Sequence, residues 1–170
     1  LKVESKLGEG TKYTIMFPFK IDPHPHVEKK SLEHVSLKGV KALLVEDNDL
    51  NLEIAKFHLE QQQVQVFTAM NGQEAVDAFE QSDIGFYDII LMDIMMPVMD
   101  GLEATRQIRS MERPDARAVP IIAMSANAFK EDVRKSLEAG MNAHLIKPID
   151  GAKVIDTMKN YLANKLLEEK

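Results

Sequence analysis

The chain has 170 residues, of which 45% are hydrophobic, enough to form the core of one ordinary domain with short extra segments. It contains no cysteine, which excludes disulfides, cysteine-ligated zinc and thiol catalysis. Its net charge of −6 argues against nucleic acid as a direct partner, and no apolar run is long enough to span a membrane. With no signal peptide at its start, we expect a cytoplasmic fragment without direct membrane contact, whether or not its parent is membrane-bound. Because it begins with Leu1, we expect it to be part of a longer protein.

The first 37 residues differ in composition from the rest of the chain. A glycine-rich segment, Gly8–Thr11, is followed by the alternating run Tyr13–Phe17, which predicts a turn leading into a strand. Residues 21–37 are polar, contain two prolines and show no sustained period. This composition is typical of a linker.

From Val40 to about Leu162, short apolar runs alternate with amphipathic segments. Three of the runs are almost continuously apolar, as strands buried on both faces of a parallel sheet are. The segments between them repeat apolar residues every three or four positions, which is helical spacing. This alternation predicts a doubly wound α/β fold with a five-stranded parallel sheet and helices on both faces. The predicted strands are Val40–Val45, Val64–Phe67, Ile89–Met92, Ile121–Met124 and Ala143–Ile146.

Residues at the predicted helix ends agree with this assignment. Asn71 and Glu74 have the spacing of a capping box at the start of a helix. Gly140 occupies a position where a helix is expected to end in a left-handed residue. Asp150 can cap the start of the last helix.

Charged or hydroxyl side chains follow four of the five predicted strands. Glu46 and Asp47 follow the first strand, Asp93 the third, Ser125 the fourth and Lys147 the fifth. In an open parallel sheet, ligands bind outside the carboxyl ends of the strands, where these side chains would meet. We therefore predict one functional site built from all four strand ends.

The charge of this cluster predicts a metal ion. Three neighbouring carboxylates repel one another unless a cation compensates, and Lys147 supplies only one positive charge. A hard divalent cation with oxygen ligands, Mg²⁺, suits one or two carboxylates together with water and phosphate oxygens. Such an ion beside a carboxylate, a lysine and a hydroxyl is suited to phosphoryl transfer, since the carboxylate can act as a nucleophile towards phosphorus.

These motifs resemble the receiver domains of response regulators. The resemblance rests on Glu46-Asp47, the segment Ile90–Gly101, Ser125-Ala126 and Lys147-Pro148, and it extends over residues 38–166. It implies a flavodoxin-like (β/α)5 fold with strand order 2-1-3-4-5. Residues 167–170 would then form a charged tail.

By this resemblance, Asp93 is the residue that accepts a phosphoryl group from a phosphohistidine. Asp47 would bind Mg²⁺ directly, and Glu46 would act mainly through water. Asp93 itself and the backbone carbonyl of Met95 would complete the protein ligands of the metal.

The resemblance also implies a conformational switch. Ser125 would hydrogen-bond the attached phosphoryl group, Lys147 would pair with it, and the bond from Lys147 to Pro148 is a candidate for a cis peptide. The phosphoryl group adds roughly −1.5 to −2 charge at pH 7, which would draw Ser125 and the following loop inward. His144 stands where the family often has an aromatic switch residue, so we expect it to take part.

The beginning of the chain resembles a different part of the same signalling system. Gly8–Thr11 and Tyr13–Phe19 are similar to the last glycine box and final strand of a histidine-kinase ATP-binding domain. We therefore interpret residues 1–20 as the end of such a domain, too short to bind ATP. This implies a hybrid sensor histidine kinase as parent and a histidine phosphotransfer domain as partner. The receiver would not be an enzyme on its own, beyond promoting its own phosphorylation and dephosphorylation.

The sequence leaves two alternatives open. A degenerate receiver would act only through protein contacts, but it would be expected to lack an acid or the lysine, and all are present. A phosphohydrolase with an aspartyl intermediate usually has a second aspartate two residues after the nucleophile, where this chain has Met95. Titration with Mg²⁺ separates the first alternative from a native receiver, and turnover of small phosphate esters would indicate the second.

Overall fold

The computed structural model describes residues 2–6, 8, 10–16, 35–126 and 129–168, which divide into two units, Leu1–Lys30 and Ser31–Lys170. Most of the predicted linker (residues 21–34) and the end of the predicted tail (residues 169–170) lie outside the described residues. Within the described part of the chain, no helix is both long enough and apolar enough to cross a membrane.

The first unit contains an antiparallel hairpin of β1 (Lys2–Lys6) and β2 (Gly10–Thr14), in which Lys2 pairs with Thr14. Gly8 and Gly10 have φ values of 82° and 101°, in the left-handed region that glycine adopts without strain. The predicted turn is therefore present, but the strand runs from Gly10 to Thr14 and shares only Tyr13 and Thr14 with the predicted run, whose residues 17–19 lie outside the described residues. Strand β1 was not predicted, because all of its residues are exposed and its sequence shows no apolar period.

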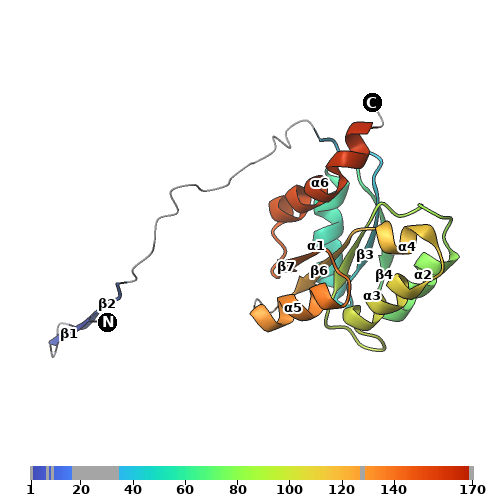
Figure 1. The fold of residues 1–170 in the computed structure, drawn as a ribbon. Coiled ribbons are helices and arrows are strands. Elements are labelled where there is room, and N and C mark those ends of the chain that lie inside the picture. Colours follow the sequence, from blue (N-terminus) through green and yellow to red (C-terminus); the bar gives the residue numbers. More distant parts are fainter. Residues whose placement is uncertain (1, 7, 9, 17–34, 127–128, 169–170) are drawn as a thin grey trace. The chain divides into compact units, whose positions relative to one another are not determined.

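The second unit contains the predicted five-stranded parallel sheet (Figure 1). The strand order is β4-β3-β5-β6-β7, which is 2-1-3-4-5 when the strands of this unit are counted from its start, as the resemblance implied. The three most apolar strands lie in the interior of the sheet, and the half-exposed strands β4 and β7 form its edges. The strands are β3 (Lys41–Val45), β4 (Gln65–Ala69), β5 (Ile89–Asp93), β6 (Ile121–Ser125) and β7 (Ala143–Ile146).

Helices follow every strand of this sheet (Figure 1). The three helix-end residues behave as predicted: Asn71 accepts the N–H of Glu74, Gly140 has a φ of 101°, and Asp150 accepts the N–H of Ala152. The short helix α4 was not predicted. The helices are α1 (Asp49–Glu60), α2 (Gly72–Gln81), α3 (Gly101–Ser110), α4 (Pro114–Ala118), α5 (Lys130–Glu138) and α6 (Gly151–Glu168).

The core lies on both faces of the sheet. On one face α2, α3 and α4 pack against alternate strand residues such as Ile90 and Met92, and on the other α1 and α6 pack against Ile89 and Leu91. Because all five strands are parallel, their carboxyl ends lie at one edge of the sheet, where a ligand site is expected. Leu37, inside the predicted linker, is only 2% exposed and belongs to the second of these clusters, so the packed unit extends upstream of residue 38.

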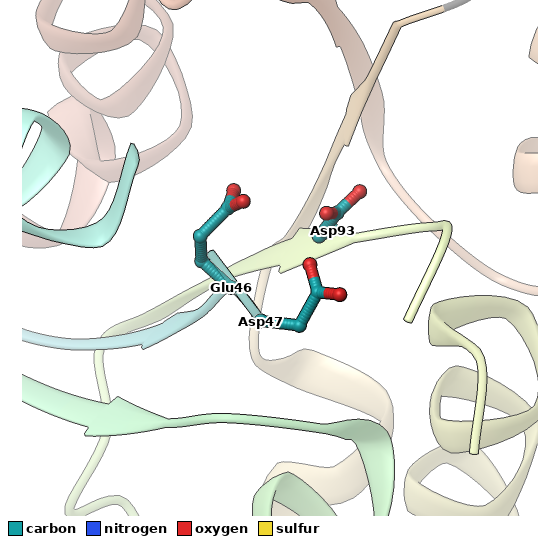
Figure 2. A group of neighbouring side chains, drawn as sticks. All are labelled: Glu46, Asp47 and Asp93. Atoms are coloured by element: carbon teal, nitrogen blue, oxygen red, sulfur yellow. The ribbon is translucent and has the colours of Figure 1, made fainter. Parts of the chain in front are cut away.

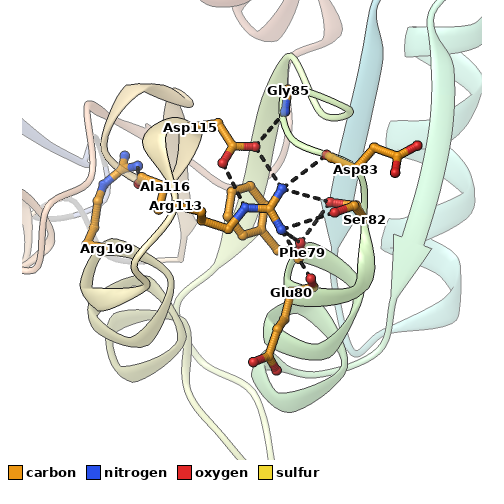
Figure 3. Close-up of polar contacts among 9 residues, drawn as sticks. All are labelled: Phe79, Glu80, Ser82, Asp83, Gly85, Arg109, Arg113, Asp115 and Ala116. Atoms are coloured by element: carbon orange, nitrogen blue, oxygen red, sulfur yellow. Dashed lines mark hydrogen bonds and ion pairs between the residues drawn. The ribbon is translucent and has the colours of Figure 1, made fainter.

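Arg113 is the N-cap residue of α4, and its side chain binds the C-terminal end of α2 and the residues that follow it (Figure 3). Its guanidinium forms a two-pronged ion pair with Asp115, at 2.7 and 2.8 Å, and both side chains are only 12% exposed. A cation in this place is stabilised by the partial negative charge at the C-terminus of a helix. The guanidinium also donates hydrogen bonds to the backbone carbonyls of Phe79, Glu80, Ser82 and Asp83.

The hydrogen bonds from Arg113 hold the pKa of Asp115 at about 2, below its usual 3.8. Because the folded-state pKa is depressed, the pair stabilises the fold fully above the ordinary pKa and loses this effect as the pH falls towards 2. We expect Asp115→Asn to lower the free energy of unfolding by about 1–2 kcal/mol at pH 7, after allowance for solvent screening. Urea unfolding from pH 7 down to pH 3 should show this difference narrowing below pH 4. A difference that stayed constant with pH would contradict the assignment.

Candidate functional site

Three acidic residues meet at the carboxyl edge of the sheet (Figure 2). Glu46 and Asp47 follow β3, and Asp93 is the last residue of β5, the strand beside it. One carboxylate oxygen from each lies within 4.8 Å of the others. Glu46 and Asp93 are 1% and 4% exposed, whereas Asp47 is open to solvent. The prediction that these three side chains come together is confirmed.

Lys147 follows the edge strand β7 and reaches into the acidic cluster. Its Nζ lies 2.7 Å from Asp93 Oδ2 and 2.6 Å from Glu46 Oε2. Burial lowers the pKa of Lys147, but the two carboxylates outweigh burial and hold it above its usual value. Burial raises the pKa of Asp93, and the hydrogen bond and charge of Lys147 offset only part of this effect. Lys147 and Asp93 therefore face each other in poorly solvated surroundings.

Ser125 and His144 occupy different positions relative to the acidic cluster. Ser125 is the buried last residue of β6, and its backbone carbonyl accepts the N–H of Lys147 at 2.7 Å. His144 is half-buried on β7, where its Nδ1 lies 3.1 Å from Ser136 Oγ of α5. The Lys147–Pro148 peptide bond is cis, as predicted. Ser125 thus lies at the site edge, and His144 connects the edge strand to α5.

The loop after β5 is folded tightly against Asp93. The backbone N–H of Met95 donates to Asp93 Oδ1 at 3.2 Å, and the N–H of Gly101 donates to the carbonyl of Ile94 at 3.0 Å. A Cβ on Gly101 would lie 2.1 Å from the backbone oxygen of Asp93, which no real structure tolerates. Gly101 therefore permits the first turn of α3 to approach the end of β5.

Two residues support the site in ways that the sequence did not indicate: Asn51, which was not predicted, and Gly101, which was noted only as the end of the segment Ile90–Gly101. Asn51 Nδ2 donates a hydrogen bond to Glu46 Oε1 at 3.0 Å. The available signal was a polar amide in the first turn of the helix that follows Glu46 and Asp47. For Gly101 the signal was a glycine following a good N-cap residue, Asp100, whose side chain accepts the N–H of Glu103.

The residues present fit a divalent cation. Three carboxylates face a single ammonium group, so the cluster is short of positive charge. Glu46 Oε2 is buried, and its one charged contact within the described residues is Lys147 Nζ at 2.6 Å. Asp47 offers an exposed carboxylate that a hydrated ion can reach. An all-oxygen set with few carboxylates and space for water is the type that Mg²⁺ prefers.

The fold and this cluster define a doubly wound α/β domain with an acidic site at the carboxyl edge of its sheet, and a comparison with protein families identifies which one. The response regulator receiver domain matches residues 42–159, and the chain belongs to that family.

Proteins with similar sequences include histidine kinases, each matched over only part of its length. The chain is 33% identical to probable histidine kinase 1 of Oryza sativa subsp. indica, in an alignment that covers 95% of this chain and 20% of the kinase. It is 38% identical to the peroxide stress-activated histidine kinase mak1 of Schizosaccharomyces pombe, over 68% of this chain and 7% of mak1. The chain thus spans about a fifth or less of these relatives.

Solved structures agree with the family assignment. A receiver domain of a sensor histidine kinase from Pseudomonas aeruginosa, with a magnesium ion coordinated in its active site cleft, is 39% identical with a TM-score of 0.67. The match covers 74% of this chain and 98% of that domain. A co-crystal structure of the Saccharomyces cerevisiae histidine phosphotransfer protein Ypd1 with the receiver domain of Ssk1 matches at 28% identity and a TM-score of 0.68. It covers 76% of this chain and 93% of the matched chain.

Proposed function

We propose that this receiver takes a phosphoryl group from a phosphohistidine onto Asp93 in a Mg²⁺-dependent reaction and changes conformation in response. The observation that carries the proposal is the pairing of a buried carboxylate, Asp93, with Lys147 at 2.7 Å, beside two further acids. Burying two carboxylates next to an exposed third lowers the stability of the fold, because like charges at this distance repel one another. A cluster with a purely structural role would offer no compensation for this cost.

Each side chain has a role in the proposed reaction. A carboxylate oxygen of Asp93 forms the new O–P bond while the N–P bond of the phosphohistidine breaks, and the electron pair of that bond returns to the imidazole nitrogen. Asp47, Asp93 and the backbone carbonyl of Met95 would hold Mg²⁺, with Glu46 acting through its water. The ion supplies positive charge that balances the transferred phosphoryl oxygens. Lys147, which follows the edge strand β7, supplies the second positive charge.

The proposed switch depends on Ser125 and His144. The Ser125 hydroxyl would hydrogen-bond the phosphoryl group and draw the loop after β6 towards Asp93. Since His144 bonds to Ser136 of α5, a change in the β6–α5 loop can alter this contact. His144 would then transmit the change to the β7 edge.

The parent chain is best described as a hybrid sensor histidine kinase whose ATP-binding domain ends in the β1–β2 hairpin. The alignment with the Oryza sativa kinase supports this proposal, because it covers 95% of the chain and so extends well upstream of the receiver. The coding sequence upstream of Leu1 tests it. A histidine-bearing dimerisation helix and the remainder of a nucleotide pocket are expected there.

The proposed partner for phosphoryl exchange is a histidine phosphotransfer domain, by analogy with the Ypd1–Ssk1 complex. Helix α1 begins two residues after Asp47 and carries a stripe of exposed apolar side chains on one face. Leu50, Ile54 and Phe57 are 69%, 43% and 59% exposed at spacings of four and three residues. Apolar side chains in such an arrangement mark protein interaction surfaces.

We expect Ile54→Asp to slow phosphoryl transfer from a phosphorylated histidine phosphotransfer protein by about tenfold or more, because a charge is placed in an apolar interface. Labelling by acetyl phosphate should be unchanged, since this small donor needs no docking surface. Leu137→Asp is a matched control, because Leu137 is also exposed (51%) but lies on α5. Equal transfer rates for the two variants would remove α1 from the interface.

The function itself is tested with the unmodified chain. Incubation with acetyl phosphate and Mg²⁺ should add the mass of one phosphoryl group, and chelation of Mg²⁺ with EDTA should prevent this. Beryllofluoride should bind under the same conditions and shift the amide resonances around Ser125. A chain that takes up neither reagent would be a degenerate receiver.

A further inference from the structure

The two carboxylate oxygens of Glu46 have different surroundings. Oε1 accepts a hydrogen bond from Asn51 Nδ2 at 3.0 Å. Oε2 lies 2.6 Å from Lys147 Nζ and accepts no hydrogen bond within the described residues. Because the carboxylate is planar, the amide that holds Oε1 also determines where Oε2 points.

Asn51 is itself held in place by the start of α1. It is the third residue of the helix, and its backbone N–H donates to the N-cap side chain, Asn48 Oδ1, at 3.0 Å. At this position a longer Glu or Gln side chain often turns back to the backbone of the N-cap residue. The shorter Asn51 amide instead points across to Glu46. The rigid first turn of a helix thus fixes the orientation of a buried acid.

We propose that Asn51 is a positioning residue for the Mg²⁺ site, acting through Glu46. This inference rests on the proposed function. Lys147 contacts both Glu46 and Asp93, so it cannot orient Glu46 once it pairs with a phosphoryl group on Asp93. The Asn51 amide keeps Oε2 directed at the water shell of the ion during that exchange. Hydrogen-bonded partners behind a metal site commonly set its affinity.

The test measures Mg²⁺ affinity in the unphosphorylated protein. Asn51→Leu preserves the approximate shape of the side chain and removes its donor. We expect this variant to raise the Mg²⁺ dissociation constant about five- to tenfold, measured by isothermal titration calorimetry or amide chemical shifts. At saturating Mg²⁺, labelling of Asp93 by acetyl phosphate should return to within about twofold of the wild-type rate. If Asn51→Leu does not fold, Asn51→Ala takes its place.

A double-mutant cycle separates positioning from a general effect on the fold. In a Glu46→Ala background, Asn51→Leu should cause no further loss of Mg²⁺ affinity, because the residue through which it acts is gone. Equal losses in both backgrounds, or an unchanged dissociation constant for Asn51→Leu alone, would overturn the proposal. Recovery of labelling at high Mg²⁺ in Asn51→Leu is the result that a purely structural role would not produce.

Asn71→Ala provides the control for helix stability. It removes the N-cap of α2, at a cost of about 1 kcal/mol, and the Asn71 side chain bonds to Glu74 rather than to Asn51 or Glu46. We expect a lower melting temperature and an unchanged Mg²⁺ affinity. Failure of the wild-type chain to bind Mg²⁺ would reject the proposed function as a whole. Normal binding by both the wild type and Asn51→Leu would reject only the role of Asn51.

Discussion

Replacing Asp93 with asparagine is expected to abolish labelling by both acetyl phosphate and a phosphohistidine donor. An amide carries no negative charge and is a poor nucleophile towards phosphorus, so the rate should fall more than about a thousandfold. The fold should be retained, because asparagine has nearly the same shape and burial already disfavours the Asp93 charge. Lys147 keeps Glu46 as an ionic partner in the variant. Intact mass spectrometry and thermal unfolding measure the two effects.

The matched control for this variant is Asp100→Asn in the same loop. Asp100 is the N-cap of α3, and asparagine can accept the N–H of Glu103 equally well. Asp100→Asn should therefore keep both its stability and the wild-type labelling rate. Labelling of Asp93→Asn at the wild-type rate, or a phosphoryl group mapped to another residue in the wild type, would reject Asp93 as the acceptor.

The second large effect is expected for Gly101→Ala. The added Cβ would stand 2.1 Å from the backbone oxygen of Asp93 and 2.9 Å from the side chain of Met92. Since strand β5 is buried on both faces, it cannot move away without disturbing the core. We expect a loss of about 3 kcal/mol in the free energy of unfolding, or roughly 10 °C in melting temperature. Labelling at low temperature should also slow severalfold, because the clash displaces the acceptor.

Gly151→Ala distinguishes this clash from the general effect of adding a methyl group at the start of a helix. Gly151 is the first residue of α6, as Gly101 is of α3, but its Cβ would meet the ring of His58 at 2.6 Å. A side chain can rotate where a buried strand cannot, so we expect a change within about 1 kcal/mol. Similar losses for the two alanine variants would show that the acceptor strand tolerates displacement.

Strand and helix positions in the receiver unit could be predicted because their causes are local. Ile89–Met92 and Ile121–Met124 are apolar on both faces, and the structure places both strands in the middle of the sheet. The edge strand β4 was shifted, from Val64–Phe67 to Gln65–Ala69, because its residues are partly exposed and its apolar pattern ends early. Helix α4 contains only five residues, too short for a periodic signal, and it is held by the ion pair within Arg113–Asp115.

The candidate site likewise has features that could be predicted from the sequence and features that could not. The sequence by itself determined which chemical groups follow the strands, Glu46 and Asp47, Asp93, Ser125 and Lys147, because strand ends and residue types can be read locally. Only the tertiary structure decided that Lys147 lies 2.6–2.7 Å from two acids that are 54 or more positions away. It alone decided that Asn51 turns towards Glu46 and that α3 leaves no space for a Cβ beside Asp93. These contacts depend on the register of parallel strands and on the packing of helices against them, which no local pattern encodes.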